Sequence, residues 1–284
     1  MHLVECPRDA MQGLPHFIPT AQKIAYLQAL LAVGFDSLDF GSFVSPKAIP
    51  QLADTAAVLA GLDLSATSTQ LLAIIANERG AEAATQHPEI RYLGYPLSVS
   101  ETFQQRNTNR SIAEALADVG RIQARAVRAG QQLVVYLSMG FGNPYGDAYE
   151  PAILAAFTEK LVALGVTIVS LADTVGSGEP ASIEAAFRAL IPAFPGVTFG
   201  AHLHTTPATW AAKVAAAYTG GCRRFDGALG GLGGCPMAGD TLTGNLPTEN
   251  LIAWLDAAGI PLNLQRPALA AATQQVGELL ITNY

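Results

Sequence analysis

Short apolar runs alternate along the chain with longer stretches in which apolar residues recur at every third or fourth position. The short runs predict β-strands, and residues 133–137 (Leu-Val-Val-Tyr-Leu) have the continuous apolar character of a strand buried on both faces of a parallel sheet. Eight strands are predicted, at residues 3–6, 37–40, 71–76, 92–95, 133–137, 167–172, 198–204 and 224–228. Residues 62–67 also have an extended pattern and compete for the place of the third strand.

The longer stretches predict amphipathic helices with a period near 3.6 residues. They lie at residues 22–33, 111–129, 150–164, 182–191 and 207–219. Ser111 followed by Glu114 has the spacing of a capping box, which marks a helix start. Eight strand–helix units in 284 residues favour an α/β fold, a closed (β/α)₈ TIM barrel, over an open doubly wound sheet. No linker rich in proline, serine or glycine divides the chain, so we expect one domain over residues 1–284.

Composition narrows the class of protein further. Half of the residues are hydrophobic and 14% are charged, which suits a large buried core and excludes a disordered chain. The net charge of −7 and the lack of a basic stripe argue against a nucleic-acid partner, and no apolar run reaches the roughly 18 residues of a membrane span. The three cysteines do not suit a disulfide framework, and no leader pattern precedes the first strand, so we expect a cytoplasmic protein.

The polar residues that follow the strands are the candidates for chemistry, because such a barrel builds its active site at the carboxyl ends of its strands. After the first, second and fourth strands come Arg8, Asp9, Gln12, Asp39, Ser42, Ser100, Glu101, Asn107 and Asn109. After the fifth to eighth strands come Ser138, Asn143, Asp173, His202, His204, Cys235 and Asn245. These side chains are expected to gather at one mouth of the barrel.

His202 and His204 are the sharpest local feature among them. Residues i and i+2 of a strand point to the same side, so both imidazoles can reach one point in the barrel mouth. Together with carboxylate and amide oxygens they suit a divalent ion such as Mg²⁺, Mn²⁺ or Zn²⁺. The alternative is two unrelated surface histidines at a strand end, and the His-x-His pattern alone does not decide between the two.

Two carboxylates also have competing interpretations. Asp9 after Arg8 is either an ion pair that caps the barrel or a metal ligand, since an adjacent arginine keeps a buried carboxylate ionised. Asp173 ends an apolar strand, and it is either a group of the active site or the N-cap of the next helix. Both interpretations stay open for each residue on this pattern alone.

Residues 227–236 form a glycine-dense segment, Gly-Ala-Leu-Gly-Gly-Leu-Gly-Gly-Cys-Pro. Such a segment after the eighth strand can be a lid that excludes water, a loop that approaches a phosphate, or a flexible connection. Cys235 near its end can act as an acid or base when a lid closes, although a loop cysteine taken alone is more often inert.

These motifs in this order resemble the 3-hydroxy-3-methylglutaryl-CoA lyase family, within a wider group of metal-dependent lyase and synthase barrels. The resemblance rests on residues 5–12 (Glu-Cys-Pro-Arg-Asp-Ala-Met-Gln), 42–47 (Ser-Phe-Val-Ser-Pro-Lys), 100–103, 106–111, 170–176 (Ser-Leu-Ala-Asp-Thr-Val-Gly), 202–204 and 231–236. Residues 42–47 and 231–236 are specific to this lyase family. The Arg-Asp and His-x-His pieces also occur in relatives that perform other aldol-type reactions.

The resemblance implies a role for each candidate residue. A divalent ion (Mg²⁺ or Mn²⁺, with Zn²⁺ as an alternative) is held by Asp9, His202, His204 and Asn245. The implied catalytic residues are Arg8, which stabilises an enolate oxygen, Cys235 as a mobile acid or base on a lid, His202, Asp39 and Asp173. The expected substrate-binding residues are Arg8, Gln12, Ser42, Asn107 and Ser138.

The reaction that the resemblance implies is cleavage of 3-hydroxy-3-methylglutaryl-CoA to acetoacetate and acetyl-CoA, as in leucine degradation. The expected partners are this small acyl-CoA substrate and a second copy of the chain in a homodimer. The alternatives are a lyase for a related 3-hydroxyacyl-CoA or 3-hydroxy acid, a condensing synthase, and a non-catalytic barrel that binds a ligand.

Several positions depart from the family pattern. The family has Gly at the place of Ala10, Leu at Met11, Glu at Asp39, Cys at Asn143 and Asp at Thr205. The loop between Cys235 and Asn245 is one residue longer than in the family. Because Arg8 and both histidines remain, these changes suggest a different or broader substrate rather than an inactive chain.

Overall fold

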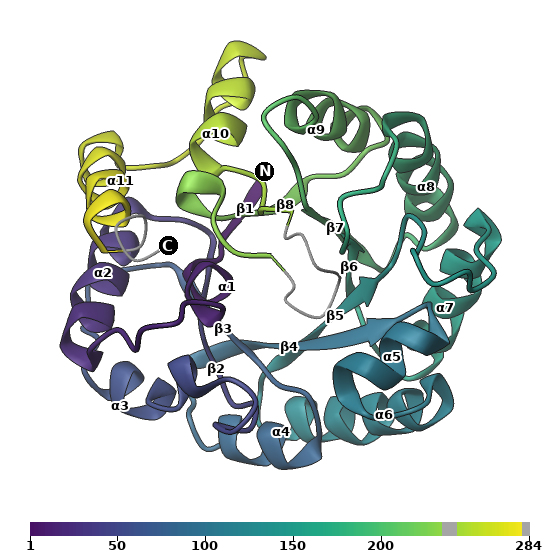
Figure 1. Cartoon of the computed structure of the whole chain (residues 1–284), viewed down its shortest axis with the longest axis horizontal. Helices are drawn as coiled ribbons and strands as arrows, with labels where there is room; N and C mark the ends of the chain where they lie inside the picture. Colours follow the sequence, from purple (N-terminus) through teal and green to yellow (C-terminus); the bar gives the residue numbers. More distant parts are fainter. Residues whose placement is uncertain (235–242, 280–284) are drawn as a thin grey trace.

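The computed structural model describes residues 1–234 and 243–279. Eight parallel strands close into one barrel, each paired with the next along the chain, and helices surround it (Figure 1). The strands are β1 (His2–Glu5), β2 (Ser37–Ser42), β3 (Gln70–Ile74), β4 (Ile90–Ser98), β5 (Gln132–Ser138), β6 (Ile168–Asp173), β7 (Thr198–Leu203) and β8 (Arg224–Gly227). The predicted TIM barrel is confirmed, and residues 62–67 are not its third strand.

Helices follow the strands, and most of them form the outer ring, whereas α1 lies inside this ring (Figure 1). They are α1 (Pro7–Gln12), α2 (Thr20–Val33), α3 (Thr55–Ala60), α4 (Glu78–Ala84), α5 (Glu101–Thr108), α6 (Ile112–Arg128), α7 (Pro151–Ala163), α8 (Pro180–Ala193), α9 (Trp210–Thr219), α10 (Thr248–Ala257) and α11 (Arg266–Leu279), with short 3₁₀ helices η1 (Pro50–Leu52) and η2 (Leu229–Gly231). All five predicted helices are present, and Ser111 and Glu114 form the predicted capping box of α6. Helices of one or two turns, such as α1 and α3, are too short to show a clear helical period in sequence. In the described part of the chain, no helix has both the length and the apolar character needed to cross a membrane.

The fourth strand extends beyond the predicted range of residues 92–95 and contains Pro96, although proline is usually excluded from a strand paired on both sides. The pairing explains this exception. The ladder between β3 and β4 ends at Gly94, whose carbonyl oxygen accepts from the N–H of Ile75. Backbone groups two residues apart point to the same side of a strand, so Pro96 faces the β3 side beyond the end of that ladder.

The two sides of the barrel wall bury different kinds of residues. Outward-facing side chains such as Leu38 and Phe40 pack with the helices in one large hydrophobic core. Inside the barrel, a small apolar cluster contains Leu72, Val134, Tyr136 and Ile168. Along β8 the inward positions are instead charged, since Arg224 and Asp226 are both buried there. The interior thus becomes polar on the β7–β8 side, where the two histidines also lie.

Glu5 links the first strand to the end of the last one. It is fully buried on β1, where Oε1 accepts from the N–H of Leu229 at 2.9 Å and Oε2 accepts from Oγ1 of Thr248 at 2.6 Å. Burial raises the pKa of this carboxyl to about 8. Glu5 therefore keeps its proton in the folded barrel at pH values where the unfolded chain has already released it.

We expect the contribution of Glu5 to the free energy of unfolding to fall as the pH rises from 5 to 8, because this carboxyl keeps its proton in the folded chain and loses it in the unfolded chain within this window. The contribution of Glu5 is complete below the unfolded pKa of 4.5 and is lost as the pH passes the folded pKa of about 8. One proton changes stability by about 1.4 kcal/mol per pH unit, so the loss between pH 5 and 7 is on the order of 3 kcal/mol.

Urea unfolding at pH 5, 6 and 7 measures this dependence. Glu5→Gln removes the titrating group and keeps an oxygen that accepts from Leu229, and its amide N–H faces the hydroxyl of Thr248, which can accept as well as donate. The pH dependence that the wild type has beyond that of this variant is the contribution of Glu5. Glu82→Gln on the exposed side of α4 is the matched control and should follow the wild type. A Glu5→Gln profile as steep as that of the wild type would contradict the prediction.

Candidate active site

A cavity of about 300 Å³ opens at the carboxyl ends of the strands, with a charged end and an apolar wall. The charged end is lined by Arg8, Asp9, Gln12, His202 and His204. The apolar wall is lined by Val44, Ala48, Ile49, Ile74, Ala76, Pro96, Phe103 and Tyr136. Mostly apolar pockets with a few convergent polar groups are typical of small-molecule sites.

The three side chains with the strongest metal-binding pattern meet at the charged end. One ligand atom each of Asp9, His202 and His204 lies within 4.8 Å of the others. Nε2 of His204 is buried without a hydrogen-bond partner among the described residues, whereas its Nδ1 lies 2.8 Å from the carbonyl oxygen of Thr174. That contact requires the proton on Nδ1, so the lone pair of Nε2 is available to a ligand. A free imidazole nitrogen beside a carboxylate and a second histidine fits a divalent ion such as Mg²⁺, Mn²⁺ or Zn²⁺.

The surrounding charges tune the protonation of this cluster. Burial raises the pKa of the Asp9 carboxyl, but the charges of Arg8 and of both histidines outweigh burial and hold that pKa below its ordinary value. Burial, with the charge of His202, lowers the pKa of His204 to about 4, so this imidazole is neutral near pH 7. Burial also acts to lower the pKa of His202, but the hydrogen bond and charge of Asp226 leave it raised. Asp9 and His204 are therefore in the forms that bind a cation.

Asn245, which follows the last strand of the barrel, lies beside Asp9, which follows the first. Its Nδ2 donates to Oδ2 of Asp9 at 2.7 Å and to the carbonyl oxygen of Leu232 at 2.8 Å. These two bonds use both amide hydrogens, which leaves Oδ1 as the atom that can approach an ion. The longer loop before Asn245 therefore does not separate it from Asp9, while its role as a ligand stays a prediction.

Arg8 is fixed by carboxylates on two sides. Nε and Nη2 donate to Oδ2 of Asp39 at 2.9 and 2.6 Å. Nη1 donates to Asp9 and to Gln12, each at 2.9 Å. Four of the five N–H groups of the guanidinium are thus engaged, and the group is held rigidly at the edge of the cavity. Burial raises the pKa of Asp39 to about 6 against the opposing charge of Arg8, and Asp39 is not among the residues that line the cavity.

Comparison with known proteins matches residues 4–276 to the family model described as HMGL-like. The chain belongs to the HMGL-like family. It is 32% identical to the (R)-citramalyl-CoA lyase of Chloroflexus aurantiacus, over 96% of this chain and 89% of that protein. It is 34% identical to a hydroxymethylglutaryl-CoA lyase of Bacillus subtilis, over 96% of this chain and 90% of that one. A solved HMG-CoA lyase structure from Bacillus subtilis has a TM-score of 0.91 at 33% identity and covers 98% of this chain and 92% of its own.

Membership of this family makes the chain an enzyme, a lyase of the oxo-acid type. Of the expected substrate-binding residues, Gln12, Asn107 and Ser138 line the cavity. Ser42 is not among the lining residues, and its hydroxyl accepts from the N–H of Val44 at 3.1 Å. Cys235 lies outside the described residues. The substrate contacts of all these residues stay predictions.

Asp173 ends β6, and it is not among the residues that line the cavity of this HMGL-like enzyme. Its Oδ2 accepts from Nζ of Lys213 at 2.6 Å, and its Oδ1 accepts from the N–H of Gly178 at 2.9 Å. The same Nζ, which reaches in from α9, donates to the carbonyl oxygens of Gly176 and His204 at 2.8 and 3.1 Å. The pair therefore ties the ends of β6 and β7 together beside His204. Asp173 does not cap α8, so that interpretation is wrong.

Sequence reasoning missed two buried charged residues at this site, Asp226 and Lys213. Asp226 follows Arg224 by two residues, and this i, i+2 spacing on β8 is the same spacing that places His202 and His204 on one side of β7. Lys213 is a single charge within an alanine-rich helix. Nothing local distinguishes it from a surface lysine, because its burial depends on how α9 packs on the barrel.

The described part of the glycine-dense segment packs against Asp9 and Asn245 of the candidate metal-binding cluster. Positive φ angles occur at Gly230, Gly231, Gly233 and Gly234. A Cβ on Gly233 would lie 2.6 Å from the carbonyl oxygen of Asp9 and 2.8 Å from Nδ2 of Asn245. Glycine is thus required at this position both by the backbone conformation and by the close approach. This packing favours a built support for the site over a merely flexible connection.

Replacing Gly233 with alanine is expected to weaken Mn²⁺ binding by a factor on the order of 10 to 100, because Asp9 or Asn245 must move to admit the methyl group. Isothermal titration calorimetry with MnCl₂ measures the effect. Gly196→Ala is the matched control, since a Cβ there meets no atom within 4 Å. Unchanged affinity in Gly233→Ala would show that the close approach does not matter for the site.

Proposed function

We propose that this enzyme is a divalent-metal-dependent carbon–carbon lyase that cleaves 3-hydroxy-3-methylglutaryl-CoA to acetoacetate and acetyl-CoA. The observation that carries the proposal is the convergence of Arg8, Asp9, His202 and His204 at one end of an apolar cavity. A substrate with a carboxylate, a tertiary hydroxyl and a methyl group matches a pocket with a cationic end and an apolar wall. The similarity to hydroxymethylglutaryl-CoA lyases along nearly the whole chain supports the same reaction.

Asp9, His202 and His204, with Oδ1 of Asn245, would hold the ion, for which Mg²⁺ and Mn²⁺ are the first candidates and Zn²⁺ an alternative. When bound, such an ion supplies Lewis acidity that lowers the pKa of a substrate hydroxyl. The residues around it align the C3 hydroxyl and the carboxylate at the charged end, so that the thioester lies toward Arg8 and the apolar wall.

In the proposed reaction a base removes the proton of the C3 hydroxyl, the C2–C3 bond breaks, and C3 becomes the ketone carbon of acetoacetate. The electron pair of the broken bond passes into the thioester as an enolate, and an acid then protonates C2 to give acetyl-CoA. Of the expected proton-transfer groups, His202 lines the cavity, whereas Asp39 and Asp173 do not. Because Nε2 of His202 would hold the ion and Nδ1 faces Asp226, His202 contributes to this step as a ligand of the ion that lowers the pKa of the hydroxyl, and not as the base itself.

Arg8 is the group proposed to stabilise the enolate oxygen. Four of its N–H groups are engaged with Asp39, Asp9 and Gln12, which leaves one on Nη2 for the substrate. A donor fixed before the charge develops needs no reorganisation during the reaction, and one such donor contributes roughly 10² to 10³ in rate. Asp39 acts here as the support that fixes the guanidinium.

Cys235 is the proposed acid, on the strength of the family resemblance of residues 231–236. We expect Cys235→Ser to leave the affinity for Mn²⁺ unchanged and to cut turnover by a factor on the order of 10² or more, as loss of a general acid does. Turnover of Cys235→Ser and of the control variant Cys222→Ser is measured at saturating substrate and metal. Wild-type turnover in Cys235→Ser would remove this role.

A second candidate substrate is (R)-citramalyl-CoA, which the relative from Chloroflexus aurantiacus is named for. It has the same tertiary hydroxyl and thioester, but its carboxylate is attached directly to the carbinol carbon, one methylene closer than in 3-hydroxy-3-methylglutaryl-CoA. Its cleavage would release pyruvate in place of acetoacetate. The departure from glutamate to Asp39, which shifts the support of Arg8 by one methylene, is a reason to test it.

The deciding experiment incubates Mn²⁺-loaded protein with each thioester, with EDTA as the control. Acetoacetate is followed with 3-hydroxybutyrate dehydrogenase and NADH, and pyruvate with lactate dehydrogenase and NADH. EDTA-sensitive release of acetoacetate with the larger kcat/KM supports the proposal, whereas a preference for citramalyl-CoA moves the assignment to the second candidate. Release from neither thioester would contradict both. A homodimer and a place in leucine degradation stay predictions.

A further inference from the structure

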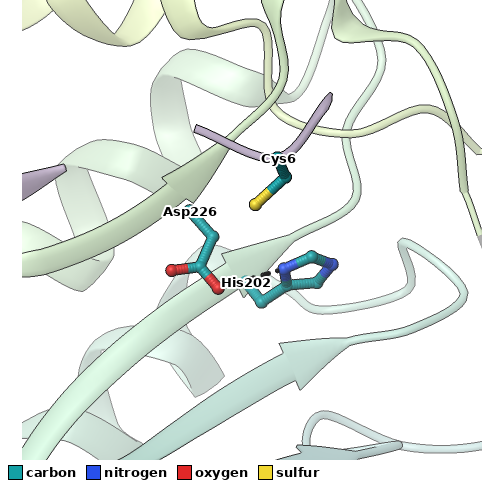
Figure 2. Close-up of side chains that lie close together, drawn as sticks. All are labelled: Cys6, His202 and Asp226. Atoms are coloured by element: carbon teal, nitrogen blue, oxygen red, sulfur yellow. Dashed lines mark hydrogen bonds and ion pairs between the residues drawn. The ribbon is translucent and has the colours of Figure 1, made fainter. Parts of the chain in front are cut away.

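Nδ1 of His202 faces a buried carboxylate on the neighbouring strand, that of Asp226. The two residues face each other across the β7–β8 ladder, where they are register partners. Oδ2 of Asp226 lies 3.2 Å from Nδ1 of His202, and Asp226 is only 1% exposed (Figure 2). An ionised carboxylate can only accept, so Nδ1 of the imidazole must carry the proton of this bond. In the neutral imidazole, Nε2 then carries the lone pair, which is directed to the cation that Asp9 and His204 would also hold.

Asp226 is itself held in place by Arg224. Nη1 of Arg224 donates to Oδ1 of Asp226 at 2.8 Å, so each carboxylate oxygen has one partner. Arg224 is 3% exposed and stands two residues earlier on β8, hence on the same inner side of the barrel. The attraction of Arg224 and the bond from His202 keep the pKa of Asp226 below its ordinary value despite its burial.

The imidazole of His202 is also confined by its neighbours. The ring of Tyr136 meets it edge-on with centroids 5.7 Å apart, and the ring of His204 lies at 5.4 Å. Cys6, which lies between β1 and α1, directs its sulfur toward Asp226 and the imidazole (Figure 2). Rotation of the ring by 180° would bring a carbon opposite Asp226 and lose the only described hydrogen bond of Nδ1.

We propose that Asp226 is a positioning residue, which fixes the tautomer and the ring orientation of His202 so that Nε2 is presented to the divalent ion. This inference rests on the metal site of the proposed function. Such outer partners of metal-binding histidines typically change metal affinity by 10- to 100-fold when they are removed. The Nδ1 of His204 is supported in the same way by the backbone carbonyl of Thr174. A side-chain substitution cannot remove a backbone carbonyl, so Asp226 is the support that mutagenesis can test.

The first test compares the dissociation constant for Mn²⁺ of the wild type with those of Asp226→Asn and a matched control. The control is Asp118→Asn, which also replaces a buried carboxylate paired with arginine, but on α6 outside the barrel. We expect a 10- to 100-fold weaker constant for Asp226→Asn and no change for Asp118→Asn, measured by EPR of free Mn²⁺ well below the melting temperature of each variant. A purely structural role would lower the melting temperature without changing the constant, and that result overturns the inference.

The second test reads the tautomer of His202 in the wild type itself. Long-range ¹H–¹⁵N spectra of histidine-labelled, Mg²⁺-loaded wild type resolve the ring nitrogens of the five histidines, and His202→Gln assigns the set of interest. The expected result is the Nδ1–H tautomer of His202. The Nε2–H tautomer would place the ion on the side of Cys6 and Asp226 and overturn the inference. Absence of Mn²⁺ binding by the wild type overturns the metal site and this inference together, whereas equal binding by Asp226→Asn overturns the inference alone.

Discussion

Replacing His204 with alanine is expected to abolish stoichiometric binding of Mn²⁺ at micromolar concentration. Its Nε2 is buried without a hydrogen-bond partner among the described residues, so no hydrogen bond in that part of the chain depends on this atom. Structural four-ligand zinc sites gain roughly 10 to 16 kcal/mol, or about 3 kcal/mol per ligand, so one lost ligand weakens binding by about 10²-fold or more. EPR of free Mn²⁺ during titration gives the stoichiometry and the constant.

The matched control for this variant is His16→Ala, which removes an exposed imidazole that is not among the residues lining the cavity. Its Mn²⁺ binding should equal that of the wild type. Because His204 donates only one side-chain bond, to the carbonyl oxygen of Thr174, the variant should remain folded, which circular dichroism checks. Stoichiometric Mn²⁺ in folded His204→Ala would refute the metal site built on Asp9 and the two histidines.

Replacing Lys213 with methionine is expected to destabilise the barrel by about 3 to 5 kcal/mol, the usual result of leaving one member of a buried ion pair alone. Lys213 is 2% exposed and Asp173 is 1% exposed, so water cannot replace the lost partner. The substitution also frees the carbonyl oxygen of His204, and we expect weaker Mn²⁺ binding as a second effect. Urea unfolding at pH 7 measures the loss of stability, with the exposed Lys47→Met as the control.

The double variant Lys213→Met, Asp173→Asn distinguishes a structural role of Asp173, as the ion-pair partner of Lys213, from a catalytic role. The amide oxygen that the second substitution introduces would still accept from the N–H of Gly178, and no buried charge remains, so most of the stability should return. If Asp173 acts only with Lys213 as a tie between β6 and β7, turnover should recover along with stability. Stability without turnover would instead return Asp173 to the catalytic residues.

The strands and the convergence of Asp9, His202 and His204 could be predicted from the sequence because both follow from local rules. Alternation of apolar runs gives the strands, and the i, i+2 spacing puts His202 and His204 on one side of β7. The rule that active sites form at the carboxyl ends of barrel strands brings Asp9 to them. None of these inferences requires knowledge of which residues are register partners across the sheet.

The supports of the cluster could not be predicted, because they depend on register and on helix packing. Asp226 meets His202 through the offset between β7 and β8, and the same residue one position away would face the helices instead. Lys213 meets Asp173 because α9 lies against the ends of β6 and β7. Pairings of this kind are fixed only when the barrel has closed.

The structure also accounts for one departure from the family pattern. Asn143, where the family has cysteine, accepts from the N–H groups of Tyr145 and Asp147 and donates to the carbonyl oxygen of Asp147. Asp147 in turn accepts from Thr102 and Ser100 at the start of α5, the helix that carries Asn107 to the cavity. Asn143 thus organises a loop that supports the cavity wall, which makes this departure a structural one.

The bond between Asp9 and Asn245 joins residues 236 positions apart. During synthesis on a ribosome, Asp9 leaves the exit tunnel long before Asn245, so the proposed site cannot assemble until β8 and the segment after it have emerged. An ion that binds only the complete set favours the finished barrel by mass action, by about 2.7 kcal/mol at a hundredfold excess over its dissociation constant. Metal supply would then influence how much newly made protein reaches the native state, and a nascent chain stalled before Asn245 should gain no protection from proteolysis when Mn²⁺ is added.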